Sequence, residues 1–142
     1  LAERIGWPFI EAYDFHSQAS REKMIAGKPL DDEDRTPWLA ALNAELLKQS
    51  PVVLACSALK QSYRDQLSKG LSTRVIWINL SRELAIERVS GRRYHFMPVS
   101  LVESQFDAAE VPGEAIFLSA AEPVESLIQR CLEALDEFVS EH

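Results

Sequence analysis

Four short segments, separated by longer stretches with helical spacing, constrain the fold of this chain more than any other feature of its sequence. They are residues 8–12 (PFIEA), 51–56 (PVVLAC), 74–80 (RVIWINL) and 114–119 (EAIFLS). The first is a short strand candidate, and the other three are brief, nearly continuous apolar runs. Such runs are typical of strands that are buried on both faces of a parallel sheet.

The segments between these strands carry apolar residues at three- and four-residue steps, which is the spacing of amphipathic helices. One helix is predicted to begin near Thr36 and Pro37, another after Ser81, and a third over residues 101–106. The clearest helix is the last, whose apolar stripe consists of Val124, Leu127, Ile128, Cys131, Leu132, Leu135, Phe138 and Val139. Strands that alternate with helices predict an α/β fold, a three-layer parallel sheet with helices on both faces, in a single domain of residues 1–142.

Composition and charge narrow the classes of function. A chain of 142 residues, 46% of them hydrophobic, is long enough for one packed core, and its net charge of -7 disfavours broad binding to nucleic acid. No apolar run is long enough to cross a bilayer, and the first residues lack the order of a signal peptide. Cys56 and Cys131 have no zinc-type spacing and fit buried thiols in a reducing compartment. We therefore expect a cytoplasmic protein without nucleic-acid or membrane partners.

Polar residues follow two of the predicted strands, at the positions where ligands gather in open parallel sheets. After the first strand come Glu11, Asp14 and His16, which could hold a metal or a substrate hydroxyl, although a solvated loop explains the same residues. After the second strand, Lys60 and Arg64 lie four residues apart, the spacing of one helical face. They could clamp a carboxylate or phosphate, or form an exposed row of charges, and the spacing leaves both interpretations open.

A basic segment, RVSGRRYHFMP at residues 88–98, could close over a polyphosphate as a lid, because arginine suits charge spread over phosphoryl oxygens. A basic helix C-terminus that favours the helix dipole is the alternative. The candidate lid residues are Arg88, Arg92, Arg93 and His95.

The acidic run before Arg35 predicts a turn and a helix start, formed by Asp31, Asp32, Glu33 and Asp34.

A set of motifs runs through nearly the whole chain. They are DFH, KMIAGKPLDDEDRTPWL, VVLACSALKQSYRD, RRYHFMP and SLVESQF, followed by a Glu-Pro pair before the last helix. In this order they resemble the motifs of gluconokinases of the gluconate kinase family. The resemblance implies a P-loop kinase fold, transfer of the terminal phosphoryl group of ATP to the 6-hydroxyl of D-gluconate, Mg²⁺ as the metal, and a homodimer.

The same resemblance implies roles for individual side chains. The implied substrate-binding residues are His16, Arg35, Lys60, Arg64 and Gln105. The implied catalytic residues are Lys60, Glu11 and Asp14, with Glu11 also as the metal ligand. The lid over ATP would contain Arg88, Arg92, Arg93 and His95.

The sequence also departs from the family pattern. The strand, Gly-rich GxxGxGK[ST] loop and following helix are expected to be missing, because the first residues read as the last turn of that helix. Tyr13 stands where the family has an acidic residue. The absent strand would lie between strands 51–56 and 74–80, so we expect either direct pairing across the gap or another strand that fills it. An impaired kinase-like domain that binds a small acid or a protein partner is the alternative function.

Overall fold

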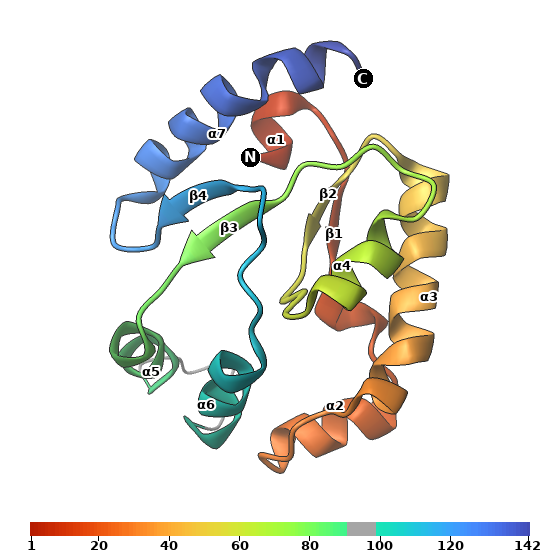
Figure 1. The fold of residues 1–142 in the computed structure, drawn as a ribbon, viewed down its shortest axis with the longest axis vertical. Helices are drawn as coiled ribbons and strands as arrows, with labels where there is room; N and C mark the ends of the chain where they lie inside the picture. The colour runs from red at the N-terminus through yellow and green to blue at the C-terminus, as the bar shows by residue number, and fades with distance from the viewer. Residues whose placement is uncertain (91–98) are drawn as a thin grey trace.

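The computed structural model describes residues 1–90 and 99–142, in which strands and helices alternate (Figure 1). The strands are β1 (Phe9–Glu11), β2 (Val53–Ala55), β3 (Ile76–Asn79) and β4 (Ile116–Ser119). The α-helices are α1 (Ala2–Ile5), α2 (Gln18–Ile25), α3 (Asp32–Gln49), α4 (Gln61–Ser68), α5 (Arg82–Ser90), α6 (Val99–Ala108) and α7 (Val124–Ser140). A 3-10 helix, η1 (Ala12–Phe15), follows β1. All four predicted strands are present, and each is shorter than its predicted segment.

The four strands form two separate parallel pairs. Strand β1 pairs with β2, with Phe9 opposite Val53, and β3 pairs with β4, with Ile76 opposite Ile116. Over the described ranges, β2 and β3 are not paired with each other. The gap that we expected at an absent central strand is therefore present, and direct pairing does not close it.

Each pair of strands has its own hydrophobic core. Helices α3 and α4 pack on β1 and β2 around Leu39 and the completely buried Leu42. Helix α7 packs on β3 and β4 through Cys131 and Leu135, with Leu127, Phe138 and Val139 beside them, which confirms most of the predicted apolar stripe. Val124, in the first turn, is 70% exposed and does not belong to it. Figure 1 shows α1 beside α7, and an ion pair of 2.9 Å between Arg4 and Glu125 joins the two helices. In the part of the chain that the structure describes, no helix combines the length and the apolar character needed to span a membrane.

Helix α3 begins earlier than the sequence predicted, at Asp32 rather than near Thr36 and Pro37. The carboxylate of Asp31 accepts a hydrogen bond of 2.7 Å from the Asp34 amide, and that of Asp34 accepts one of 3.0 Å from the Asp31 amide. This reciprocal capping box satisfies backbone donors of the first turn and starts the helix there. Pro37 lies inside the helix, where it removes one backbone hydrogen bond. The predicted helix-start role of the acidic run is confirmed.

The packing of α3 can be tested with a buried and an exposed leucine on the same helix. Leu42→Ala should destabilise the fold by about 2–5 kcal/mol, because it leaves a cavity in the first core. Leu47→Ala is the control, because Leu47 is 50% exposed and its loss should cost less than about 1 kcal/mol. Urea unfolding followed by circular dichroism measures both free energies. Equal losses in the two variants would contradict this placement of the core.

Candidate functional site

Charged and aromatic side chains gather where β1 and β2 end. Because the two strands are parallel and in register, their last residues, Glu11 and Ala55, lie opposite each other. Tyr63, on α4, brings two cations together there. Arg35 Nη1 lies 3.2 Å from the Tyr63 hydroxyl, and Lys60 Nζ lies 5.6 Å from the centre of the Tyr63 ring. The structure therefore brings together Arg35 and Lys60, two of the predicted substrate-binding residues.

Asp32 links this group of side chains from the start of α3. Its Oδ1 lies 3.2 Å from Lys60 Nζ and also accepts a hydrogen bond from the Tyr63 hydroxyl. The hydrogen bonds from Tyr63 and Lys60 lower the pKa of Asp32. The hydrogen bond to Asp32 in turn raises the pKa of Lys60, so the ammonium group stays charged at neutral pH. We call Asp32, Arg35, Lys60 and Tyr63 the cation cluster.

His16 follows η1 and lies close to the cation cluster. Its ring stacks on Trp38 with 4.2 Å between ring centres, and Trp38 Nε1 donates a 2.8 Å hydrogen bond to the Ala12 carbonyl. Burial, together with the positive charges of Arg35 and Arg21, lowers the pKa of His16 to about 4. The imidazole is therefore neutral at pH 7. Its Nδ1 is buried without a hydrogen-bond partner among the described residues, whereas the residue as a whole is partly exposed.

The predicted acidic residues lie at the end of β1. The Glu11 carboxylate caps η1 by accepting a 3.4 Å hydrogen bond from the Tyr13 amide. Asp14 is exposed, and its backbone carbonyl accepts a 2.8 Å hydrogen bond from Arg21 Nη2. Arg21 also lies 5.4 Å from the centre of the Tyr13 ring. Tyr13 is therefore held beside Arg21, at the position where an acidic residue was expected.

Glu11 is the residue that the resemblance implies as a metal ligand. Within the described ranges, no three histidine, cysteine or acidic side chains gather into a metal site. Glu11 is exposed at the end of β1, and one carboxylate suits a divalent ion that takes its remaining ligands from phosphate oxygens and water. Glu11 as a metal ligand remains a prediction.

The four-residue spacing predicted that Lys60 and Arg64 share one helical face. In the structure they do not. Lys60 is the N-cap of α4 and has extended backbone angles, so the rule for helical neighbours does not apply to this pair. Arg64 is 5% exposed, and its guanidinium donates to the carbonyls of Ala58, Leu59 and Glu110 at 2.7, 3.3 and 2.7 Å. It therefore supports the loop after β2, in which Ala58 has a positive φ of 39°.

The remaining predicted residues lie on α5 and α6 or outside the described ranges. Arg88 Nη2 donates a 2.8 Å hydrogen bond to the carbonyl of Ala120, just beyond β4. Gln105 is half-buried on α6. The other lid candidates lie outside the described residues; these are Arg92, Arg93 and His95. The lid function therefore remains a prediction.

Three residues around this site were not among the predicted site residues. Asp32 was interpreted only as part of a helix start, whereas Trp38 and Tyr63 occupy apolar helix positions that usually belong to a core. Their contacts with the cations depend on how α3 packs against α4, which spacing in the sequence does not reveal. The signal available was their presence inside DDEDRTPWL and CSALKQSYRD, the two most distinctive motifs.

The protonation of His16 tests this electrostatic arrangement. In NMR titrations, the ring should show a pKa of about 4 in the folded chain and about 6.5 in urea, where burial and the nearby cations are lost. Because the folded pKa is the lower one, the unfolded state binds more protons between these values. The contribution of His16 to stability is thus complete above about pH 6.5 and is lost as the pH falls towards 4.

His16→Gln is the matched variant for this titration. The substitution should remove the contribution of His16 to the pH dependence of the unfolding free energy. The contributions of other titrating groups should remain. A folded-state ring that titrates near 6.5 would contradict the burial of His16 against Trp38.

Comparison with known proteins shows close relatives. No protein-family model matches the chain. A probable gluconokinase of Schizosaccharomyces pombe is 38% identical, over 100% of this chain and 81% of the relative. A gluconokinase of Gluconobacter oxydans is 44% identical, over 80% of this chain and 67% of the relative. The crystal structure of a gluconokinase from Sinorhizobium meliloti matches with a TM-score of 0.84 and 38% identity, over 99% of this chain and 83% of that one.

The similarity thus extends over nearly all of this chain in both sequence and structure. It confirms the predicted α/β fold of the P-loop kinase type, because the matched solved structures are sugar kinases. The chain belongs to the gluconokinase family.

Proposed function

We propose that this chain provides the gluconate site for ATP-dependent phosphorylation of D-gluconate at its 6-hydroxyl. Gluconokinases use gluconate and ATP, with a divalent metal. The observation that supports the proposal most strongly is the cation cluster at the ends of β1 and β2, where Arg35 and Lys60 both contact Tyr63. Gluconate carries one carboxylate and a chain of hydroxyls, and a site with two cations beside a neutral histidine suits that combination.

Each side chain of the site has a proposed part in binding. Arg35 and Lys60 hold the carboxylate by charge-assisted hydrogen bonds, and Asp32 keeps Lys60 in place through their 3.2 Å ion pair. His16, neutral and partly exposed, bonds through its ring to a hydroxyl of the sugar acid. Burial of the ring against Trp38 limits its movement. Binding of the carboxylate and of this hydroxyl fixes where the 6-hydroxyl of gluconate lies.

Phosphoryl transfer depends mainly on such positioning and on stabilisation of charge. Glu11 and Asp14 are exposed carboxylates after β1, and either one is a candidate to accept the proton of the reacting hydroxyl. A divalent ion bound with ATP would stabilise charge on the phosphoryl oxygens. The role of Glu11 towards such an ion is part of the proposal.

The nucleotide side of the reaction needs a part that these residues do not include. The 142 residues contain no Gly-rich loop of the GxxGxGK[ST] type, and backbone amides of such a loop cradle the phosphates of ATP. Gluconate binding is therefore expected to be separable from nucleotide binding in this chain. The second candidate function, a domain that binds a sugar acid without phosphorylating it, is favoured by Tyr13 at the position where the family has an acidic residue.

Calorimetric titration separates these two functions. The chain is titrated with gluconate and, separately, with Mg-ATP, and turnover is measured with both present. We expect gluconate to bind. Binding of Mg-ATP with turnover would support the kinase, and gluconate binding alone would support the non-catalytic domain. A folded chain that does not bind gluconate would contradict both.

Single substitutions locate the binding site. Arg35→Lys and Lys60→Met should each weaken gluconate binding at least about tenfold, because a hydrogen bond to a charged group contributes about 1.5–3 kcal/mol. Lys48→Met is the control, because Lys48 is exposed near the far end of α3 and should not affect affinity. Sorbitol, which resembles gluconate without the carboxylate, should bind at least about tenfold more weakly. Unchanged affinity in both site variants would exclude the cation cluster as the gluconate site.

Other expectations from the sequence remain proposals. They are the homodimer, the cytoplasmic location, the single domain of residues 1–142, and the roles of Arg64, Gln105 and the lid residues towards gluconate and ATP.

A further inference from the structure

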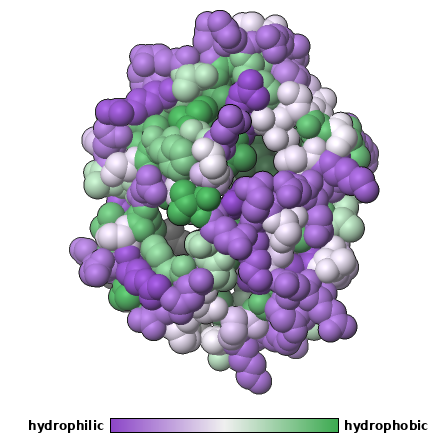
Figure 2. Space-filling model, in the orientation of Figure 1, coloured by the Kyte–Doolittle hydropathy of each residue, from purple (hydrophilic) through white to green (hydrophobic). Residues whose placement is uncertain are grey.

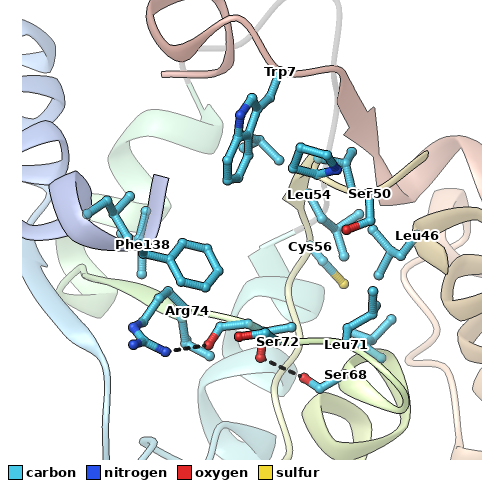
Figure 3. Close-up of a pocket in the computed structure, with 18 of the residues that line it drawn as sticks. Trp7, Leu46, Ser50, Leu54, Cys56, Ser68, Leu71, Ser72, Arg74 and Phe138 are labelled. Atoms are coloured by element: carbon cyan, nitrogen blue, oxygen red, sulfur yellow. Dashed lines mark hydrogen bonds between the residues drawn. The ribbon is translucent and has the colours of Figure 1, made fainter. Parts of the chain in front are cut away.

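A mainly apolar groove lies between β2 and β3 and encloses about 250 Å³. Figure 3 shows Leu54 and Cys56 on its β2 side, Phe138 of α7 opposite them, and Trp7 across one end. In the space-filling view, hydrophobic residues surround a hollow in this face of the molecule (Figure 2). Because a charge is costly in apolar surroundings unless it is paired, this groove does not suit the anionic groups of a ligand.

Several arginines among the described residues form no ion pair with a carboxylate; they are Arg21, Arg35, Arg64, Arg74 and Arg88. Most of them already have a place in the structure. Arg35 belongs to the cation cluster, Arg64 binds the carbonyls of the loop after β2, and Arg88 is a lid candidate. Arg74 lies 4.9 Å from the centre of the Phe138 ring, at the groove. Arg21 is left without an assigned part.

Arg21 lies on α2, beside the candidate site. The ion pair of 2.8 Å between Lys23 and Asp34 joins α2 to the first turn of α3, where Arg35 follows. The positive charges of Arg35 and Arg21 both lower the pKa of His16, so both guanidinium groups act on the same ring. His16 therefore has a cation near it that does not belong to the cation cluster.

The guanidinium of Arg21 is fixed in place and still has a free donor. Its Nη2 donates the 2.8 Å hydrogen bond to the Asp14 carbonyl, and the group lies 5.4 Å from the centre of the Tyr13 ring. The Tyr13 ring meets that of His16 edge-on, with 5.9 Å between ring centres. Nε of Arg21 is buried, whereas its Nη1 is not buried and has no hydrogen-bond partner among the described residues.

Tyr13 leaves the charge of Arg21 uncompensated. An acidic residue at this position, as the sequence led us to expect, would pair with the guanidinium and offset its charge. A tyrosine ring attracts the cation through its face and leaves the N–H donors free. Gluconate has one carboxylate, which the proposed function assigns to Arg35 and Lys60, so a second anionic group is needed to pair with Arg21.

We propose that Arg21, held by Tyr13, forms a second anion subsite, and that the site prefers sugar acids with an anionic group at both ends. One end is the carboxylate held by Arg35 and Lys60, so the proposal rests on the proposed function. The other is a phosphate or a second carboxylate, which accepts hydrogen bonds from Nη1 of Arg21. The backbone carbonyl of Asp14 and the Tyr13 ring orient the guanidinium for this contact.

Calorimetric titration of the chain tests this preference with three ligands at one ionic strength. Gluconate has one anionic end, whereas 6-phosphogluconate and D-glucarate have two. At least one of the latter should bind at least about tenfold more tightly than gluconate, because it adds a hydrogen bond between charged groups. A gain with 6-phosphogluconate alone would identify the second group as phosphate, and a gain with glucarate would identify a carboxylate.

The same titrations separate the failure of the two proposals. Gluconate binding with no gain for either two-ended acid would overturn the second anion subsite and leave the proposed function standing. A folded chain that binds none of the three ligands would overturn both.

Substitutions assign the preference to Arg21. The quantity compared is the affinity for the two-ended acid divided by the affinity for gluconate, which cancels a general loss of folded protein. Arg21→Gln should lower this ratio at least about tenfold, and Tyr13→Asp should lower it as well, because the new carboxylate would pair with Arg21. Lys28→Gln is the control, since it removes the same charge from an exposed position just after α2. An equal fall in Arg21→Gln and Lys28→Gln would overturn the proposal.

Side-chain NMR distinguishes contact with the ligand from a structural role of Arg21. The Nε–H signal of Arg21 should move further in the complex with the preferred two-ended acid than in the complex with gluconate. The corresponding signal of Arg4, which pairs with Glu125 on α7, serves as the reference and should stay in place. Equal movement of the Arg21 signal with gluconate and with the two-ended acid would overturn the second anion subsite.

Discussion

The parallel pairing of β1 with β2 is the interaction on which the candidate site depends. Glu11 and Ala55, the last residues of the two strands, lie opposite each other. The segments that follow them, η1 and the loop before α4, therefore begin close together. Helix α3 packs across this pair and is joined to η1 by the hydrogen bond from Trp38 to Ala12. It is joined to the start of α4 by the ion pair between Asp32 and Lys60. These contacts place two cations and a neutral histidine together at the carboxyl ends of β1 and β2.

The mainly apolar groove between β2 and β3 meets the candidate site at the loop after β2. Cys56 and Ala58 line the groove, and Arg64, which binds the Ala58 carbonyl, contributes to the same wall. Burial raises the pKa of the Cys56 thiol to about 11, so this sulfur stays protonated at neutral pH and acts as a small apolar side chain. Through this loop, the wall of the groove is joined to the residues of the candidate site.

The sequence predicted those features that depend on local periodicity, and it missed those that depend on contacts between elements. The stripe of α7 was recognisable because its apolar residues repeat at helical steps, and the strands because they are short, mainly apolar segments between helical stretches. The start of α3 was misplaced because the capping box lies in an acidic run that precedes the apolar repeat. Arg64 was expected beside Lys60 because helical spacing was assumed for a residue that is extended. The position of Tyr63 between the cations follows from packing of α3 on α4, which spacing alone does not show.

Chemical-shift mapping with gluconate tests the central claim, that the cations at the ends of β1 and β2 hold the sugar acid. The account predicts that the largest changes in an amide and side-chain NMR spectrum occur at Arg35, Lys60, Tyr63 and His16, and that sorbitol at the same concentration does not reproduce them. Signals of the exposed residue Glu133 on α7 should stay in place. Largest changes on α7 or around Arg74, with the cation cluster unaffected, would contradict the account.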